Sequence, residues 1–269
     1  MASVREKDGD GLRQDRPESG VLRLTLDRPQ QRNALTADLA ATLRAAVARA
    51  REDSSVRVLV VTGTGPAFCA GADLGALAAD AETPAQRRSV LADYYRAFLD
   101  LRDLPVPTIA AVNGPAIGAG LNLALSCDLR ILSRDARLAA PFLRLGIHPG
   151  GGCSWLLTRI AGTAAARELL FLGQPLSAER AFELGLANRL VNGDELAETT
   201  LDWARAIASL PGPVVRDLKR TLGLAEAGAS FEATLAVESA AQAESMASQD
   251  AAEGWAAFRE RREPHFQDR

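Results

Sequence analysis

Two glycine-rich segments have residue types and spacing that could stabilise negative charge on an oxygen atom. Residues 67–74 read AFCAGADL, residues 113–121 read NGPAIGAGL, and each follows an apolar stretch typical of a buried strand. Where a strand ends and a helix begins, the first N–H groups lack helical acceptors, and small residues let a ligand approach them. Two such turns side by side would direct two N–H donors at one oxygen, which is an oxyanion hole. The alternative is that both are tight turns selected for packing alone.

Other motifs that carry chemistry are excluded by their residues. The stretches 63–68 and 118–123 place Phe and Leu where a dinucleotide-binding fingerprint needs its third glycine. No phosphate-binding GxxxxGK[ST] motif exists, and the two lysines are Lys7 and Lys219. Two histidines are too few for a His-rich metal site, so no metal is expected. The absence of a CxxC spacing predicts reduced and mostly buried thiols at Cys69, Cys127 and Cys153.

Length and composition limit the remaining classes. The chain has 269 residues, 47% hydrophobic and 24% charged, with a formal net charge of −3. This length predicts one large domain, or a core with a smaller appendage, stabilised without disulfides or metals. The slight acidity disfavours a nucleic-acid partner. No apolar run approaches the roughly 20 residues that span a bilayer, and the N-terminus has no apolar signal region. We therefore expect a cytoplasmic protein without membrane insertion.

The elements that must position the two turns can be read from periodicity. Residues 1–20 show no helical or strand periodicity, which predicts a flexible tail. Residues 21–195 alternate strand and helix signals and predict an α/β core, whereas residues 196–269 have helical spacing throughout. Thr36 is the expected N-cap of the first long helix. Within the core we expect strands at 21–26, 56–62, 108–112 and 129–132, and helices at 37–52, 84–103 and 118–126.

Seven groups of motif residues occur in order along the chain. They lie at 26–35, 68–74, 110–120, 127–130, 145–152, 178–187 and 257–262. Each is weak alone, but together the chain resembles the enoyl-CoA hydratase/isomerase (crotonase) family over about residues 21–266. The resemblance implies a spiral of ββα units and a helical C-terminal region that mediates trimer assembly, with trimers commonly paired into hexamers. It also implies an acyl-CoA thioester as ligand, with coenzyme A as part of the substrate and no separate cofactor.

The resemblance assigns roles to residues of both turns. It places the two oxyanion N–H groups at Ala72 and Ala119. It implies that Arg32 meets the CoA phosphates and that Arg261 reaches the ribose phosphate from a neighbouring subunit, although both could be solvated surface charges. The residues implied to line the bound thioester and its CoA are Ala70, Gly71, Asp73, Leu74, Gly75 and Gly118.

The chain departs from the family where hydratases carry two glutamates. Those positions are Asn122 and Phe142, and the place where some isomerases carry an acid is Gly150. Asparagine exchanges no proton near neutral pH and can only hold a water or a carbonyl by hydrogen bonds. His148 could act as general acid or base. Alternatively, it packs under the glycine loop or binds a backbone carbonyl.

Two hypotheses follow. In the first, an enzyme of the lyase or isomerase type polarises the thioester carbonyl at Ala72 and Ala119 and performs divergent chemistry on an acyl-CoA. His148 would move protons and Asn122 would position water or substrate. In the second, a non-catalytic acyl-CoA carrier of fatty acid metabolism holds the carbonyl with the same donors, while Phe142 grips the acyl chain.

Overall fold

The computed structural model describes residues 6–8, 11–72, 74–77 and 79–269. Within these residues, seven strands form a main sheet in the order β1-β2-β3-β4-β5-β7-β10. The strands from β3 to β10 are parallel, and β1 and β2 are antiparallel additions at one edge. Their bounds are β1 Glu6–Asp8, β2 Leu12–Glu18, β3 Val21–Leu26, β4 Val58–Gly63, β5 Thr108–Val112, β7 Leu129–Ser133 and β10 Arg189–Val191.

A smaller sheet of the described residues has the order β6-β8-β9, with β6 at Ala116–Ile117, β8 at Arg137–Ala139 and β9 at Leu176–Ser177. The short helices of the described residues are η1 Pro29–Gln31, α2 Leu74–Leu77, α4 Ala119–Leu125, η2 Phe142–Leu145 and α6 Ala178–Glu183. The long helix α5, Cys153–Leu172, is kinked at Gly162, where φ is 78° and ψ is 168°. Because both glycine-rich turns adjoin β6, this sheet lies where the candidate site is built.

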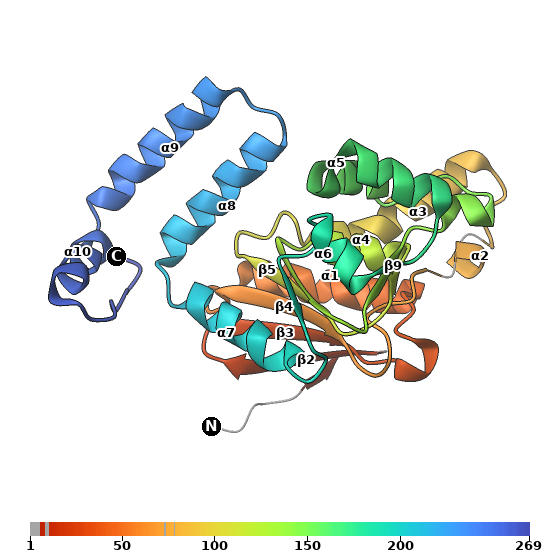
Figure 1. The fold of residues 1–269 in the computed structure, drawn as a ribbon, viewed down its shortest axis with the longest axis horizontal. Coiled ribbons are helices and arrows are strands. Elements are labelled where there is room, and N and C mark those ends of the chain that lie inside the picture. The colour runs from red at the N-terminus through yellow and green to blue at the C-terminus, as the bar shows by residue number, and fades with distance from the viewer. Residues whose placement is uncertain (1–5, 9–10, 73, 78) are drawn as a thin grey trace.

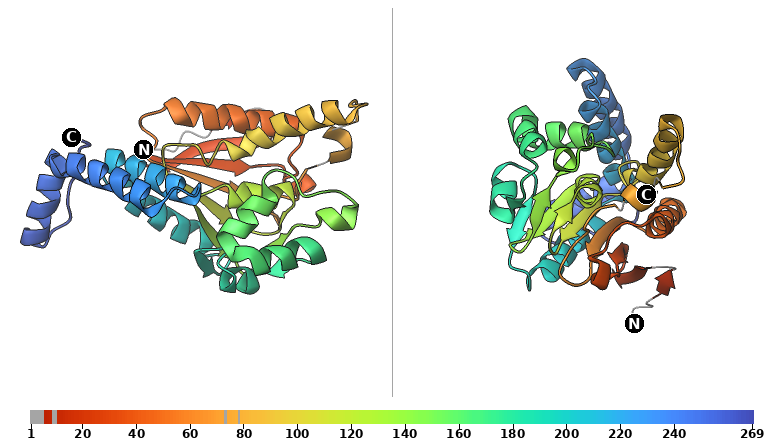
Figure 2. Two further views of the ribbon diagram at one scale, coloured as in Figure 1. Left: turned by 90° about the horizontal axis from the view of Figure 1, so that it is seen from above. Right: turned by 90° about the vertical axis from the view of Figure 1, so that its right-hand side faces the viewer.

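Helices cover both faces of the main sheet, as buried parallel strands require. Leu59 and Val61 of β4 face the cluster that contains α1, Ala37–Glu52, and α3, Pro84–Leu99. Val58 and Val60 face the other cluster, which includes residues of α7, Leu196–Ala208. Figure 2 shows α1 and α3 together on one side of the sheet.

The helix starts follow the expected chemistry. Thr36 caps α1, its hydroxyl accepting from the Leu39 N–H, as predicted. Thr83 caps α3 through a reciprocal pair of bonds with Gln86. The α3 helix ends at Leu99, short of the predicted 103, and the chain continues in turns to Leu104.

The prediction of a flexible tail over residues 1–20 is wrong for the part that the structure describes. Leu12 is fully buried, and β2 pairs with β3 from Leu12 to Glu18. Asp15 accepts a hydrogen bond at 2.9 Å from Arg23 across the two strands. Cross-strand ion pairing therefore replaces the alternation of apolar residues that the sequence reading required.

Three helices extend from the core as an arm: α8 Gly212–Glu226, α9 Phe231–Met246 and α10 Gln249–Glu260 (Figure 1). The C-terminal region is thus helical, as predicted. The packing changes after α7, which lies on the sheet, and not at the expected division between residues 195 and 196.

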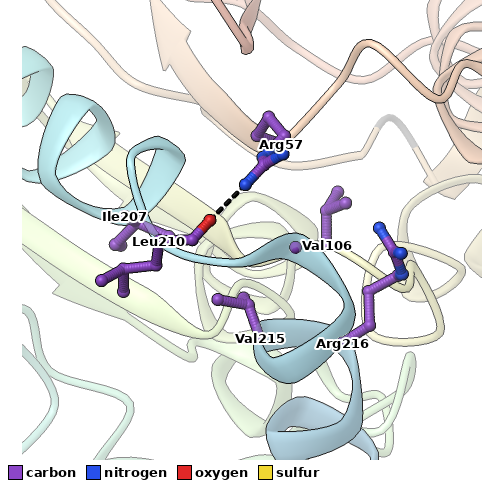
Figure 3. A pocket seen from close by; sticks show the side chains of 7 residues that line it. Arg57, Val106, Ile207, Leu210, Val215 and Arg216 are labelled. Atoms are coloured by element: carbon purple, nitrogen blue, oxygen red, sulfur yellow. Dashed lines mark hydrogen bonds between the residues drawn. The ribbon is translucent and has the colours of Figure 1, made fainter. Parts of the chain in front are cut away.

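Polar bonds hold α8 to the core. Lys219 Nζ lies 2.7 Å from Asp128 Oδ2, and Arg102 pairs with Glu226 at 3.1 Å. Where α7 leads into α8, Arg57 donates to the Leu210 carbonyl beside a cavity of about 10 Å³ (Figure 3). That volume is near the minimum for one water molecule, so this cavity is a packing gap. No helix among the described residues combines the length and hydropathy that a bilayer crossing needs.

Candidate functional site

The two glycine-rich turns lie side by side. Cys69 and Ala116 form a bridge in which the Cys69 N–H donates to Pro115 O at 3.1 Å and the Ile117 N–H donates to Cys69 O at 3.0 Å. Gly120, in the first turn of α4, faces this bridge so closely that a Cβ there would lie 2.2 Å from Cys69 O. Only glycine allows that approach.

The predicted donors Ala72 and Ala119 occupy these two turns. Ala119 is the first residue of α4, so its N–H has no acceptor within the helix. Gly71, which precedes Ala72, has a φ of 96°, and a Cβ built on it would lie 3.6 Å from Ala119 N. Gly118 precedes Ala119 with a φ of 55°. The positive φ values of Gly71 and Gly118 turn the backbone of both glycine-rich segments at the point where the segments meet.

The segment 32–35 fixes the other side of the first turn. The Ala70 N–H donates to Arg32 O at 2.9 Å, and the Leu35 N–H donates to Gly71 O at 2.9 Å. Arg32 is therefore adjacent to Ala70, with its side chain exposed. The buried Asn33 secures the segment, because its Nδ2 donates to Thr64 O at 2.9 Å and to Ala67 O at 2.8 Å. Asn33 therefore positions the backbone of this segment, and its residue type alone does not reveal that role.

Asn122 lies three residues after Ala119 on α4 and so near the same helix face. It is fully buried, and its Nδ2 donates to Gly150 O at 2.9 Å. Its Oδ1 is buried and lacks a partner among the described residues. Asn122 therefore ties α4 to the 150–152 glycine loop.

Phe142 and Tyr95 lie beside the second glycine-rich turn and the 150–152 glycine loop. Phe142 is buried, and its ring tip lies 3.9 Å from where a Gly118 Cβ would be. Tyr95 of α3 covers the glycine loop, since its hydroxyl is 2.4 Å from the place of a Gly150 Cβ. Burial raises the pKa of the Tyr95 phenol, and nearby Cys153 adds to the shift. Sequence reasoning missed Tyr95, because no local motif links α3 to a loop more than fifty residues later.

His148 is exposed, and its Nδ1 lies 2.8 Å from the Pro149 carbonyl oxygen. A carbonyl only accepts, so Nδ1 carries the proton in this bond. This arrangement matches the backbone-bonded alternative for His148. The ring is held by the residue next to it, on the surface.

Several predicted residues lie outside this cluster or outside the described residues. Asp73 lies outside the described residues, and Leu74 and Gly75 begin α2. Arg261 follows α10 with a φ of 55° and is exposed on the arm, which projects away from the core (Figure 1). Within one chain, Arg261 is therefore not brought to the two turns.

The chemistry available at the site follows from these residues. The main-chain N–H groups of Ala72 and Ala119 lie in adjoining turns, and the side chains around these turns are amide, phenyl and phenol groups. Among the described residues, none of those assembled here carries a carboxylate; they are Gly71, Ala72, Gly118, Ala119, Asn122, Phe142, Gly150 and Tyr95. No group of three His, Cys, Asp or Glu among the described residues is placed to hold a metal ion.

The three cysteines are buried and free, as predicted, and burial raises the pKa of each thiol to about 12.

A cavity of about 550 Å³, separate from the small one beside Leu210, lies between α1 and α3. Alanines of α1 and the Tyr94 ring of α3 line it. The Tyr94 hydroxyl donates to Leu35 O at 2.8 Å, which connects this cavity to the segment paired with Gly71.

Comparison with known proteins identifies the family. The family model described as "Enoyl-CoA hydratase/isomerase" matches residues 16–269. The chain is 46% identical to the probable enoyl-CoA hydratase EchA14 of Mycobacterium tuberculosis over 202 residues, which is 75% of this chain and 77% of that protein. It is 38% identical to 1,2-epoxyphenylacetyl-CoA isomerase of Escherichia coli over 251 residues, 93% of this chain and 95% of that protein.

Solved structures agree with these sequence matches. The crystal structure of an enoyl-CoA hydratase from Bacillus anthracis superposes with a TM-score of 0.90 at 32% identity, covering 97% of this chain and 100% of that one. A putative enoyl-CoA hydratase from Streptomyces coelicolor also gives a TM-score of 0.90 at 32% identity, covering 100% of this chain and 98% of that one. The predicted crotonase-type α/β fold with a helical C-terminal region is confirmed. The chain, in which two glycine-rich turns are joined by the Cys69–Ala116 bridge, belongs to the enoyl-CoA hydratase/isomerase family.

Proposed function

We propose that the chain binds an acyl-CoA thioester with its carbonyl oxygen between the N–H groups of Ala72 and Ala119. The observation that carries this proposal is the Cys69–Ala116 bridge, which holds the two turns together. Two preorganised donors at one oxygen stabilise an enolate and lower the barrier for reactions at the neighbouring carbons. Arg32 and the residues 70–75 are proposed to contact the CoA portion.

The reaction is proposed to differ from ordinary hydration of an enoyl-CoA. Hydration needs one group to activate water and another to protonate the α-carbon. Asn122 and Phe142, at the positions where the family resemblance expects those groups, cannot exchange protons near neutral pH. The proposed enzyme therefore performs lyase or isomerase chemistry through the enolate without a pair of carboxylates.

A second candidate is a non-catalytic acyl-CoA carrier of lipid metabolism. One observation favours it: the exposed His148 ring has its Nδ1 bound to Pro149 O, which leaves only Nε2 for proton transfer in this arrangement. The same N–H donors would hold the carbonyl, and the Phe142 ring would pack against the acyl group.

One set of measurements tests both candidates. Calorimetry with acetyl-, butanoyl- and octanoyl-CoA is expected to detect binding, and no binding of any of them would overturn both. Crotonyl-CoA hydration, followed by loss of enoyl absorbance, is expected to be far slower than an ordinary turnover on the order of 10 per second. Turnover at that rate would overturn the interpretation of Asn122 and Phe142.

A reaction found in a panel of CoA thioesters would favour the enzyme, and its absence would favour the carrier. His148→Ala then tests the histidine. A loss of rate of at least about 100-fold is the size expected for a general acid or base. Unchanged rates would remove His148 from the mechanism.

The arm supports a proposal about assembly. No residue of α9 is buried, and Phe231, Trp255 and Phe258 are 75%, 52% and 86% exposed. We propose that copies of the chain cover these apolar side chains in a homotrimer or hexamer, and that Arg261 reaches the CoA ribose phosphate of a neighbour. Light scattering should give a multiple of three of the 28.5 kDa chain, and a monomer at micromolar concentration would contradict it. A cytoplasmic location stays a prediction from the sequence.

A further inference from the structure

The segment 262–269 folds back along the helix that precedes it, α10. Arg261, with a φ of 55°, reverses the chain at the end of that helix. Arg262 then donates to both carboxylate oxygens of Glu253, at 2.6 and 2.9 Å, and the His265 N–H donates to the same group at 2.8 Å. These bonds lower the pKa of Glu253 to about 2. The first half of the segment is therefore held to α10 by charged contacts.

The second half of the segment is bonded to the first turn of α10. Asp250, the second residue of that helix, is 4% exposed, and its carboxylate oxygens accept from Gln267 N at 2.7 Å and from Arg269 N at 3.3 Å. In the other direction, the Asp250 N–H donates to Arg269 O at 3.0 Å. The Phe266 ring lies beside Gly254, 3.6 Å from where a Cβ would be. The segment and α10 thus form one unit.

Asp268 connects this unit to the core. It lies between the two residues bound to Asp250, but its own carboxylate binds the junction of α7 and α8. Oδ1 accepts from the Gly212 N–H at 2.7 Å, and Oδ2 accepts from Arg57 at 2.5 Å. Arg57 also donates to the Leu210 carbonyl of this junction (Figure 3). Asp268 has a φ of 61°, which costs most residues free energy, so the backbone is strained where these bonds form.

We propose that the segment 262–269 is a strap, which holds α10 in one direction relative to the core and opens at Asp268. The helices before α10 do not fix that direction. No residue of α9 is buried, and in α10 only Asp250 and Ala257 are. By contrast, Lys219 and Arg102 bind α8 to the core without the strap. Opening the strap should therefore free α10 while α8 stays in place.

The strap opens at Asp268 because its contact with the core is the more exposed one. The side chains of Arg57 and Asp268 are 22% and 33% exposed, so water competes for both charges. The contacts inside the unit include a buried carboxylate that accepts two backbone N–H bonds, which are stronger and longer-lived. The segment and α10 would thus leave the core together. Opening changes where Trp255 and Phe258 of α10, both exposed, are presented.

Amide hydrogen exchange of the full chain, read by mass spectrometry, tests the strap. Asp268→Asn keeps an oxygen for the Gly212 N–H and suits a positive φ, but it removes the charge that binds Arg57. Exchange throughout residues 249–260 is expected to become about three- to tenfold faster, because α10 loses its attachment and unfolds locally more often. Faster exchange at the start of α8 alone would show that Asp268 only caps that helix, and would overturn the proposal.

A variant on the core side of the contact separates the strap from a local effect. Arg57→Gln should accelerate exchange in α10 as well, and the double variant with Asp268→Asn should exchange no faster than the faster single variant. Arg205→Gln is the matched control, because Arg205 of α7 binds Glu18 and Asp202, both at 2.8 Å and both outside the strap. It should leave α10 at the wild-type rate. Additive effects in the double variant, or wild-type exchange of α10 in Arg57→Gln, would contradict the strap.

Discussion

Replacing Gly120 by alanine should separate the two turns that hold the proposed oxyanion donors. The added Cβ would lie 2.2 Å from Cys69 O and 2.8 Å from Cys69 Cβ. Carbon atoms pack at about 3.5 Å from their neighbours, so α4 and the segment at Cys69 must move apart by about 1 Å. Neither obstacle is the far end of a flexible side chain, and thus no rotamer change can relieve the contact.

The expected loss of stability follows from the hydrogen bonds that the movement would break and from the cost of overpacking. The bridge of Cys69 with Pro115 and Ile117 contains two hydrogen bonds, each contributing about 1 kcal/mol. Overpacking of a close-packed interior adds about 1–3 kcal/mol. We therefore expect Gly120→Ala to lower the free energy of unfolding by about 3–5 kcal/mol. The Ala119 N–H should also move relative to Ala72 and weaken butanoyl-CoA binding at least about tenfold.

Urea denaturation followed by circular dichroism gives the first quantity, and calorimetry gives the second. Gly223→Ala is the control, because Gly223 lies inside α8, where an added Cβ would meet no atom within 4 Å and φ is not positive. Alanine there should raise the free energy of unfolding by about 0.5–1 kcal/mol and leave binding unchanged. Wild-type stability and affinity in Gly120→Ala would refute the argument that close approach at Gly120 builds the site.

Four further predictions concern stability and ionisation. Lys219→Met should lower the free energy of unfolding by about 1–2 kcal/mol, because Lys219 Nζ bonds Asp128 and Val106 O at 2.7 and 2.9 Å with only 14% of its side chain exposed; an equal effect of Arg220→Met, in a pair whose arginine is 71% exposed, would contradict this. Asp268→Ala should increase amide exchange at the start of α8, because Asp268 Oδ1 accepts from Gly212 N at 2.7 Å, and unchanged exchange there would count against that role. Iodoacetamide at pH 8 should label no cysteine until urea is added, and rapid labelling of the native protein, read by mass spectrometry, would refute burial of the thiols. With folded pKa values of about 12, above the roughly 8.5 of the unfolded chain, the native thiols keep their protons and the urea midpoint should fall, not rise, from pH 8.5 upward; these thiols are Cys69, Cys127 and Cys153.

Local signals predicted the elements that carry them. The strand at 108–112 and the helix at 37–52 appear with the expected bounds, because an all-apolar run and a threonine cap each express a strong short-range preference. The β2 strand was not predictable in this way. Its residues Arg13, Gln14, Asp15 and Arg16 are polar, and they are ordered by pairing with β3, which only the folded chain provides.

In the candidate site, too, the residues with local signals were predictable and the residues brought together by long-range contacts were not. Motif residues located Ala72 and Ala119, since glycine-rich turns after buried strands are visible in the sequence. The partners of Asn122 were not visible: Gly150 lies 28 residues later in the chain, and Tyr95 comes from another helix. Long-range contacts of this kind determine what the amide can bind, and no periodicity or local motif encodes them.

The order of the main sheet has a consequence for synthesis on the ribosome. In the described residues, β3, β4, β5, β7 and β10 are neighbours in the same order in which they are translated. Each new strand can therefore join the edge left by the preceding one, without waiting for a distant segment. The glycine-rich turn after β4 exists before β5 is made, but its partner turn follows β5, so the paired donors form only when this growth has reached α4. The nascent chain thus acquires a framework first and a binding site later.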